Sequence, residues 1–285
     1  MKTFLFIALQ YLLPQHLLSR ITGRLANSRT IWFKNLLIRQ FIQHFHVDMS
    51  IAANPNPESY TTFNDFFTRP LAAGQRPVCD DPKAIASPAD GSISQLGNIK
   101  HGQIFQAKGH EYSLLELVGG DPTIAKPFND GHFATIYLSP KDYHRVHMPF
   151  SGTLQSMIHV PGDLFSVNET TANHVPRLFA RNERLVTLFK TEAGPMAVIL
   201  IGAMIVASIE TVWAGQVTPT GQRISTIHYQ NTHHIHLEKG DEMGRFRLGS
   251  TVIVLLGKEV AKWEKQLVPG YSVMMGESIG KLSGW

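Results

Sequence analysis

From about residue 84 onward, short strand-like runs follow one another with only Gly- and Pro-rich turns between them. β-Branched and aromatic residues fill these runs, and the regular amphipathic helices that connect parallel strands are missing. Strands joined by short turns pair with their neighbours in antiparallel fashion. The sequence therefore predicts a mainly antiparallel β body. The expected strands span residues 92–96, 133–138, 152–159, 185–190, 196–201, 205–212, 224–228 and 251–256.

The N-terminal segment has an unusual charge balance. Residues 1–47 contain six Lys or Arg and no acid, whereas the whole chain has 26 basic and 22 acidic residues. The body is therefore nearly neutral, which does not favour nucleic-acid binding, since a nucleic-acid binder usually presents a basic face on its folded body. Basic charge mixed with apolar residues indicates an anionic membrane surface instead.

Two parts of this segment are apolar enough to be helices. Residues 4–13 are too short to span a bilayer, which takes about 20 residues, and they make a poor signal peptide because Lys2 alone precedes them. Residues 31–47 predict an amphipathic helix. Periodicity alone allows this helix to pack on the core, but the charge bias favours membrane contact. Its apolar stripe comprises Phe33, Leu37, Phe41 and Phe45.

A further short helix is expected at residues 139–147 inside the β body. Ser139 suits its N-cap, Pro140 suits the first helical position, and Met148 is followed by a proline that ends it. His144 and His147 would then share one face, because they are three residues apart. The pair is either structural or a base and a proton donor on one rigid element.

The third feature of interest is a Gly-Ser pair that precedes an apolar run. Gly249 lacks a Cβ, so its carbonyl is open to attack, and Ser250 stands directly before the expected strand 251–256. This arrangement is either an ordinary turn into a strand or a site where the Ser250 hydroxyl attacks the preceding carbonyl. Asp90, in a turn at 87–91, is either a turn residue or a carboxylate that orients a histidine.

A cluster of histidines raises the question of a metal site. His234 and His236 would face the same way on a strand, with His233 and His228 nearby. No carboxylate or cysteine lies at a compelling spacing, so we expect an exposed strand and no metal.

Taken together, these motifs resemble the phosphatidylserine decarboxylases, from about Phe63 to the C-terminus. The spelling LGST at 248–251 is similar to that of the bacterial and mitochondrial branch. The order and spacing of the motifs also fit this family. The resemblance is carried by FFTRPL at 66–71, Arg76-Pro77, SPADG at 87–91, YHRVHMP at 143–149, PGDLFSVN at 161–168, Gly244-Arg245-Phe246 and LGST.

The resemblance implies a proenzyme that cuts itself between Gly249 and Ser250. In such a chain His147 acts as the base, Asp90 orients it, and Ser250 attacks the Gly249 carbonyl. The resulting ester undergoes β-elimination, and Ser250 becomes a pyruvoyl group with release of ammonia. The products are a β chain, 1–249, and an α chain, 250–285.

The implied reaction needs such a cofactor on chemical grounds. Loss of CO2 from an amino acid leaves a carbanion that no side chain delocalises well, and a pyruvoyl ketone joined to the substrate amine as a Schiff base does so. The product is phosphatidylethanolamine. By resemblance, His144 assists decarboxylation and delivers the proton to the carbanion. Tyr137 and Tyr143 are candidates to line the same pocket.

The resemblance also implies an α+β fold with a barrel-sandwich-hybrid-like body and N-terminal amphipathic helices. We expect residues 1–50 to form a membrane-associating segment and residues 51–285 to form the catalytic domain. The implied partners are phosphatidylserine and the anionic cytoplasmic face of the cell (inner) membrane, where the enzyme is peripheral. The cleaved chains are expected to stay associated, and a homodimer is compatible with the resemblance.

Two alternatives remain at this point. Asp90, His147 and Ser250 also fit an ordinary serine hydrolase, although the G-x-S-x-G elbow is missing from the sequence. A non-catalytic membrane-binding β domain would account for the N-terminal segment alone.

Overall fold

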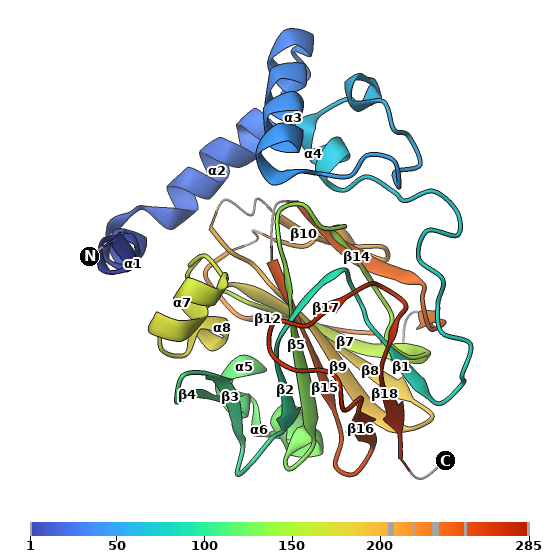
Figure 1. Cartoon of the computed structure of the whole chain (residues 1–285). Coiled ribbons are helices and arrows are strands. Elements are labelled where there is room, and N and C mark those ends of the chain that lie inside the picture. The colour runs from blue at the N-terminus through green and yellow to red at the C-terminus, as the bar shows by residue number, and fades with distance from the viewer. Residues whose placement is uncertain (1, 205–207, 219–220, 230–233, 248–249, 284–285) are drawn as a thin grey trace.

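The computed structural model describes residues 2–204, 208–218, 221–229, 234–247 and 250–283, with only the backbone of Lys2 and Ser250. A nine-stranded antiparallel sheet runs through the body (Figure 1), in the order β12-β7-β8-β9-β15-β5-β2-β17, with β13 also beside β7. These strands are β2 (Gly91–Asn98), β5 (His132–Leu138), β7 (Gly152–Val160), β8 (Arg184–Thr191), β9 (Gly194–Ile201), β12 (Ser225–His228), β13 (His236–Leu237), β15 (Ser250–Leu256) and β17 (Ser272–Val273).

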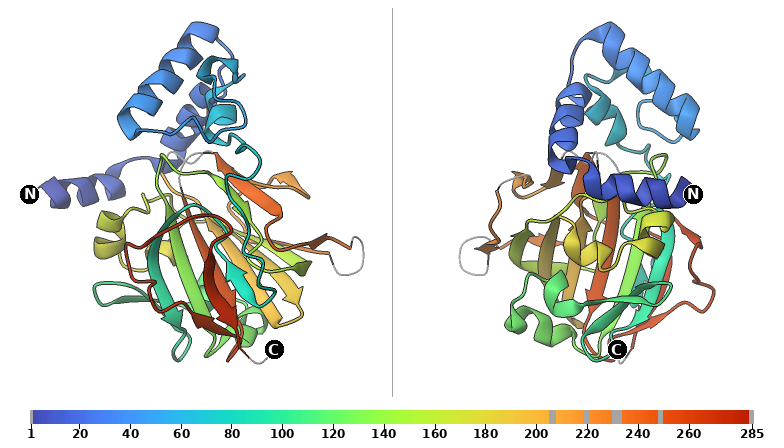
Figure 2. Two further views of the ribbon diagram at one scale, coloured as in Figure 1. Left: turned by 45° about the vertical axis from the view of Figure 1, so that its right-hand side comes forward. Right: turned by 90° about the vertical axis from the view of Figure 1, so that its left-hand side faces the viewer.

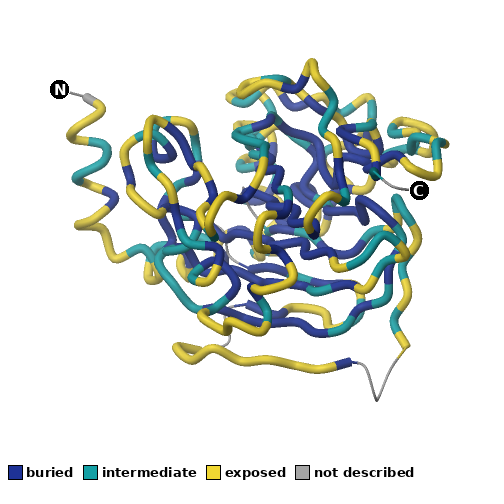
Figure 3. The backbone as a smooth tube through the Cα atoms, turned by 90° about the horizontal axis from the view of Figure 1, so that it is seen from below, coloured by how far each residue is buried: buried dark blue, intermediate teal, exposed yellow. Residues whose placement is uncertain are grey.

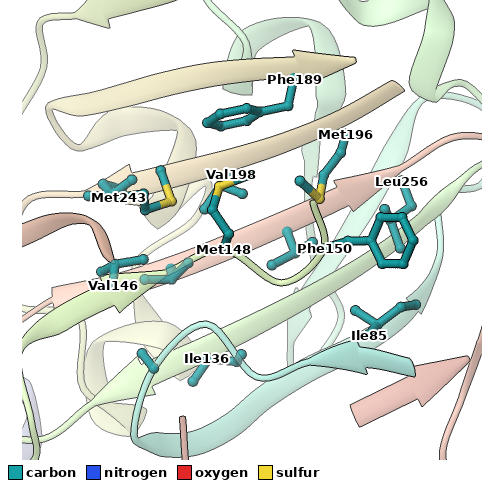
Figure 4. Close-up of a cluster of buried hydrophobic side chains, with 14 of the residues drawn as sticks. Ile85, Ile136, Val146, Met148, Phe150, Phe189, Met196, Val198, Met243 and Leu256 are labelled. Atoms are coloured by element: carbon teal, nitrogen blue, oxygen red, sulfur yellow. The ribbon is translucent and has the colours of Figure 1, made fainter. Parts of the chain in front are cut away.

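The central strand β15 explains why residues 251–256 are apolar without interruption. Successive side chains of a strand point to opposite faces of the sheet. Val252 and Val254 enter one hydrophobic cluster, whereas Ile253 and Leu255 enter a second cluster on the other face. Because both faces of β15 are covered, neither set of positions tolerates polar residues. Figure 4 shows part of the first cluster, and Figure 3 shows that the buried residues gather in the interior of the body.

Different elements cover the two faces of the large sheet. Two smaller sheets complete the first cluster, with strand orders β1-β18-β16 and β11-β10-β14-β6. Short helices and the β3–β4 hairpin cover the second cluster. The strands are β1 (Ala84–Ala86), β3 (Gln103–Ala107), β4 (His110–Ser113), β6 (Arg145–His147), β10 (Ser208–Thr211), β11 (Gly215–Gln216), β14 (Glu242–Arg247), β16 (Ala261–Trp263) and β18 (Ser278–Leu282). The helices are α5 (Leu114–Leu117), α6 (Pro122–Ala125), η2 (Lys126–Phe128), α7 (Glu169–His174) and α8 (Leu178–Arg181).

The N-terminal segment is helical and lies across one end of this body (Figure 2). Helix α1 is fastened to the loop after β7, because Gln10 Oε1 accepts a hydrogen bond from the backbone N–H of Ser166 at 3.0 Å, and Tyr11 packs edge-on against Phe165. Among the described residues, no helix is both long and apolar enough to span a bilayer. The elements are α1 (Lys2–Leu12), α2 (Gln15–Ala26), α3 (Ile31–Phe45), η1 (Pro57–Ser59) and α4 (Phe63–Phe67).

The apolar stripe of α3 does not face outward as expected. Leu37, Phe41 and Phe45 pack against a third hydrophobic cluster formed with α4, and the ring centroids of Phe41 and Phe63 lie 5.1 Å apart. Exposed apolar side chains on α3 come from the other faces of the helix. The stripe therefore packs in part against α4, as the core-packing alternative allowed, and membrane contact by this helix stays a prediction. The exposed residues are Ile31, Trp32 and Leu36.

The expected fold class is confirmed. The chain is α+β, with a mainly antiparallel body of stacked sheets and helices at the N-terminus. The division of the chain at residue 50 stays a prediction. The expected strands 92–96, 133–138, 152–159, 185–190, 196–201, 224–228 and 251–256 all lie at named strands, while residues 205–207 of the expected strand 205–212 lie outside the described residues.

Candidate active site

The predicted cleavage bond lies where β14 ends and β15 begins. β14 ends at Arg247, and the backbone of Ser250 pairs with Leu138 of β5 as the first residue of β15. Gly249 lies outside the described residues. On the other side of the bond, the Phe246 N–H donates to the carbonyl of His144 at 3.1 Å. Leu138 therefore pairs with the residue that follows this bond, and His144 pairs with the strand that precedes it.

The expected helix over residues 139–147 is wrong. Asp142 Oδ2 accepts hydrogen bonds at 2.7 Å from both the backbone N–H and the hydroxyl of Ser139, which closes a turn. Residues Arg145–His147 then form strand β6, paired with β14. So short a helix is costly to nucleate, and the backbone bonds to β14 replace it. His144 and His147 therefore share no helical face, and an odd spacing along extended chain directs them to opposite sides.

His147 is buried and held through both ring nitrogens. Its Nδ1 lies 2.7 Å from the carbonyl oxygen of Gly240, and its Nε2 lies 3.0 Å from the hydroxyl of Tyr143. A carbonyl oxygen only accepts hydrogen bonds, so Nδ1 carries the proton and Nε2 presents a lone pair. Burial lowers the pKa of His147, although the Gly240 bond opposes this shift. The imidazole is therefore neutral near pH 7 and suited to act as a base.

His144 lies in a drier environment, with none of its surface exposed. Its Nδ1 lies 2.8 Å from the carbonyl oxygen of Asp142, and its ring lies 4.0 Å, centroid to centroid, from that of Phe67. Burial lowers the pKa of His144 to about 3. The Nε2 atom is buried and has no hydrogen-bond partner among the described residues. A buried polar atom left without a partner costs free energy, so it points to a functional need.

Asp90 is close to this region but does not hydrogen-bond to His147 among the described contacts. The Arg76 guanidinium donates to its carboxylate from Nε at 2.8 Å and from Nη2 at 2.6 Å, and the Met275 N–H donates to Oδ1 at 2.8 Å. The bidentate bond from Asp90 raises the pKa of Arg76. The link to His147 runs through the backbone, since the His147 N–H donates to the Pro88 carbonyl at 2.8 Å.

The two candidate tyrosines lie in different surroundings. Tyr143 contacts His147, and burial raises the pKa of its phenol to about 12, so it stays protonated. Tyr137 pairs with Thr251 through β5 and β15, and it lines a hollow of about 210 Å³ together with Ser92 and Val167. Tyr137 is thus next to the start of β15, and Tyr143 is next to the base.

Sequence reasoning missed three contributors to this site. Arg76 belongs to the Arg76-Pro77 motif, which carried the resemblance but received no role. Phe67, also in a motif, forms the apolar wall against His144. The Gly240 carbonyl has no sequence signal, because any residue presents the same carbonyl group.

The described residues of the histidine-rich segment belong to no cluster of potential metal ligands. His233 lies outside the described residues, and His236 is on the two-residue strand β13, where its Nδ1 lies 2.9 Å from the Thr153 hydroxyl. His234 precedes this strand. No group of three potential metal ligands gathers within residues 2–204, 208–218, 221–229, 234–247 and 250–283.

Comparison with known proteins identifies the family of this chain. The family model described as phosphatidylserine decarboxylase matches residues 63–281, and one described as PSD matches residues 5–46. The chain is 59% identical over 282 residues to the phosphatidylserine decarboxylase proenzyme of Pseudomonas fluorescens strain Pf-5, covering 98% of each chain. It is 58% identical over 285 residues to the proenzyme of Azotobacter vinelandii, covering 99% of this chain and 100% of the relative. The chain therefore belongs to the phosphatidylserine decarboxylase family.

Proposed function

We propose that the chain cuts itself between Gly249 and Ser250 and decarboxylates phosphatidylserine with the pyruvoyl group that Ser250 becomes. The observation that carries this proposal is the pairing of residues 138–144 with both sides of the bond, through Leu138–Ser250 and His144–Phe246. This pairing holds the turn between β5 and β6, which ends at His144, next to residues on both sides of the bond, and so supports a role for the histidines of this segment. Membership in an enzyme family also favours this proposal over a hydrolase or a non-catalytic membrane domain.

In the cleavage step, His147 is the base. Its Nδ1 proton is directed at Gly240, so Nε2 is the atom that takes the proton of the Ser250 hydroxyl. The serine oxygen attacks the Gly249 carbonyl and the amide bond becomes an ester. β-Elimination then releases a carboxylate on Gly249, and hydrolysis of the new N-terminus gives a pyruvoyl group and ammonia. Tyr143 keeps the ring aligned by donating to Nε2 before the serine engages.

The surroundings of Ser250 suit a ketone at this position. Strand β15 is paired along its length with β9 and β5, so the first residue of the strand is held in place. A pyruvoyl group supplies a ketone that condenses with the substrate amine and accepts the electron pair released with CO2. The buried Nε2 of His144, which has no hydrogen-bond partner among the described residues, supports His144 as the proton carrier of this reaction.

His144 has a defined task in this scheme. The substrate amine arrives as an ammonium and must lose a proton before it condenses with a ketone. Because His144 Nδ1 is bonded to the Asp142 carbonyl, Nε2 is the atom that accepts this proton once the negative substrate carboxylate lies beside it and raises its proton affinity. Nε2 then delivers the proton to the substrate carbon after CO2 leaves. The product is phosphatidylethanolamine. The dry wall formed by Phe67 favours decarboxylation, since it offers the carboxylate little solvation.

The substrate class and the N-terminal helices fit a peripheral enzyme on the cytoplasmic face of the membrane. Exposed large apolar side chains occur on all three helices, and no acid accompanies their positive charge. We infer that residues 1–50 form the membrane-associating segment of the protein. The exposed residues are Phe4, Leu5, Leu9, Tyr11, Leu12, Leu17, Ile21, Leu25, Ile31, Trp32 and Leu36.

The two chains remain one particle after cleavage in this proposal. The α chain contributes β15 to the centre of the large sheet, and β17 and β18 pair with β2 and β1 of the β chain. These backbone ladders and both hydrophobic clusters remain after cleavage, because the bond lies between the end of β14 at Arg247 and the first residue of β15.

An intact-mass spectrum of the purified protein tests the proposal. We expect two masses that correspond to residues 1–249 and 250–285, with the smaller chain blocked at its N-terminus by a ketone. Ser250→Ala should give a single uncut chain without decarboxylase activity. Ser250→Cys is the matched control, because a thiol attacks the same carbonyl and still permits cleavage. Two chains cut at this bond in Ser250→Ala would contradict the mechanism.

A further inference from the structure

A hollow of about 370 Å³ lies between helix α2 and the sheet that contains β10, β11 and β14. Figure 1 shows α2 passing over this end of the body. Arg20 and Arg24 of α2 line one wall, and Arg247 of β14 and Gln216 of β11 line the other. Asn27 closes the hollow at the end of α2, where its Oδ1 lies 3.5 Å from Arg247 Nη1. Three guanidinium groups therefore converge on one space.

The positive charge of this hollow is only partly neutralised. Glu210 forms an ion pair with Arg247 and also faces Arg245, so one carboxylate is shared by two arginines. Neither Arg20 nor Arg24 has a carboxylate partner among the residues that the structure describes, and residues 1–47 contain no acid that could supply one. Within the part of the chain that the structure describes, Arg20 Nε donates to the His16 carbonyl on its own helix, at 3.3 Å. The hollow thus has donors and charge available for an anion.

The position of these arginines on α2 identifies the source of the anion. At 3.6 residues per turn, the helix presents three neighbouring rows of side chains. The first row, Ser19, Gly23 and Ala26, is buried against the protein, and the third row, Leu17, Ile21 and Leu25, is exposed and apolar. Arg20 and Arg24 form the row between them. Cations between a protein face and an exposed apolar row lie at the depth of lipid phosphates when such a helix rests on a bilayer.

We propose that this hollow binds the phosphate group of a membrane phospholipid, with Arg20 and Arg24 as its principal donors. Arginine suits this ligand because its planar guanidinium donates two parallel hydrogen bonds to phosphate oxygens. The lining includes Arg247, the last residue of β14, which stands three residues before Ser250 in the chain. This inference rests on the proposed membrane contact of the N-terminal helices and is independent of the proposed cleavage and decarboxylation.

The test compares two charge-matched variants of the full-length protein. Arg20→Gln/Arg24→Gln removes the two donors, and Arg29→Gln/Arg39→Gln removes two cations of the same segment that do not line the hollow. The probes are dihexanoylphosphatidylglycerol below its micelle concentration and inorganic phosphate, each titrated with detection by phosphorus NMR line broadening. Circular dichroism confirms folding, and the intact-mass spectrum reports cleavage separately, so failure of either proposal is distinguishable.

We expect saturable binding of the short-chain lipid to the parent protein and to the Arg29/Arg39 variant. The Arg20/Arg24 variant should bind it roughly tenfold more weakly or worse. Equal loss in both variants would show diffuse attraction by net charge and would overturn the site. Inorganic phosphate that binds as tightly as the lipid would overturn the lipid as its ligand. Absence of saturable binding to the parent would overturn the proposal altogether.

Discussion

The Nδ1 atom of His147 lies 2.7 Å from the carbonyl oxygen of Gly240, while Asp90 is bonded to Arg76 instead. In a Ser-His-Asp triad a carboxylate fixes the histidine tautomer. Here the structure assigns that task to a backbone carbonyl, and Asp90 acts on His147 through its charge and through the loop that carries Pro88. The consequences of substituting Asp90 and His147 should therefore differ.

Asp90→Asn should slow self-cleavage without abolishing it, whereas His147→Ala should leave the chain uncut. The asparagine keeps the shape of the loop but lacks the negative charge that pairs with Arg76. His147 therefore stays in place, but the nearby charge that favours its protonated form is lost. We expect a loss of roughly tenfold for Asp90→Asn and at least 10²–10⁴-fold for His147→Ala, the usual range for a general base. A time course of cleavage after cell-free synthesis, followed on gels, measures both rates. Indistinguishable rates for Asp90→Asn and the parent would remove Asp90 from the mechanism.

His144→Ala should still give two chains and a pyruvoyl group but should decarboxylate slowly. In the proposed division of roles, His144 acts after the cofactor has formed, so only turnover should depend on its buried Nε2 atom. We expect a loss of roughly 10²–10⁴-fold in turnover. The assay pairs a gel for cleavage with headgroup analysis of phosphatidylserine vesicles. An uncut His144→Ala chain would contradict the division of roles, and a cut and fully active one would make His144 structural.

Burial of His144 should make the protein less stable at mildly acidic pH. The pKa of His144 in the folded protein, about 3, lies below its ordinary value of about 6.5. Between these two pH values the histidine is protonated in the unfolded chain and neutral in the folded chain. The contribution of neutral His144 to the free energy of unfolding is fully present above about pH 6.5 and is lost as the pH falls toward the folded pKa. Between pH 6.5 and pH 5 the loss is about 2 kcal/mol, at ~1.4 kcal/mol per unit.

Urea unfolding of the uncut Ser250→Ala chain at pH 7 and pH 5 measures this effect. His144→Gln in that background should reduce the difference in the free energy of unfolding between the two pH values. His228→Gln, at an exposed position on β12, is the matched control and should leave the difference unchanged. An equal pH dependence in all three proteins would show that His144 is not the titrating group.

Exposed leucines on α1 should govern attachment to vesicles. Leu5 and Leu12 are 60% and 79% exposed, and each would bury its side chain in a bilayer interface. Leu5→Gln/Leu12→Gln should weaken binding to anionic vesicles by roughly tenfold or more, because burial of one leucine contributes ~1.5–3 kcal/mol. Flotation of the protein with vesicles provides the measurement.

The control for this experiment substitutes exposed apolar residues of the body. Leu115→Gln/Val268→Gln removes the same kind of surface from α5 and from the loop before β17. Vesicle binding by this control should match that of the parent. If both double variants lose binding equally, the N-terminal helices are not the membrane contact.

Most of the sheet is determined by local sequence. Residues 133–138 and 251–256 are mainly apolar runs, and their short length and β-branched and aromatic residues favour buried strands over buried helices. The spacing of LGST and YHRVH likewise identifies the family from residues alone, since the motif positions carry their own chemical signatures.

Tertiary structure decided what those local patterns left open. Residues 145–147 became a strand because β14, about a hundred residues later, offers them backbone partners, and this separates the faces of His144 and His147. The stripe of α3 became partly buried because it packs against α4. The carbonyl of Gly240 and the guanidinium of Arg76 hold the catalytic candidates only because folding brings distant segments within hydrogen-bond distance, and no local periodicity encodes that approach.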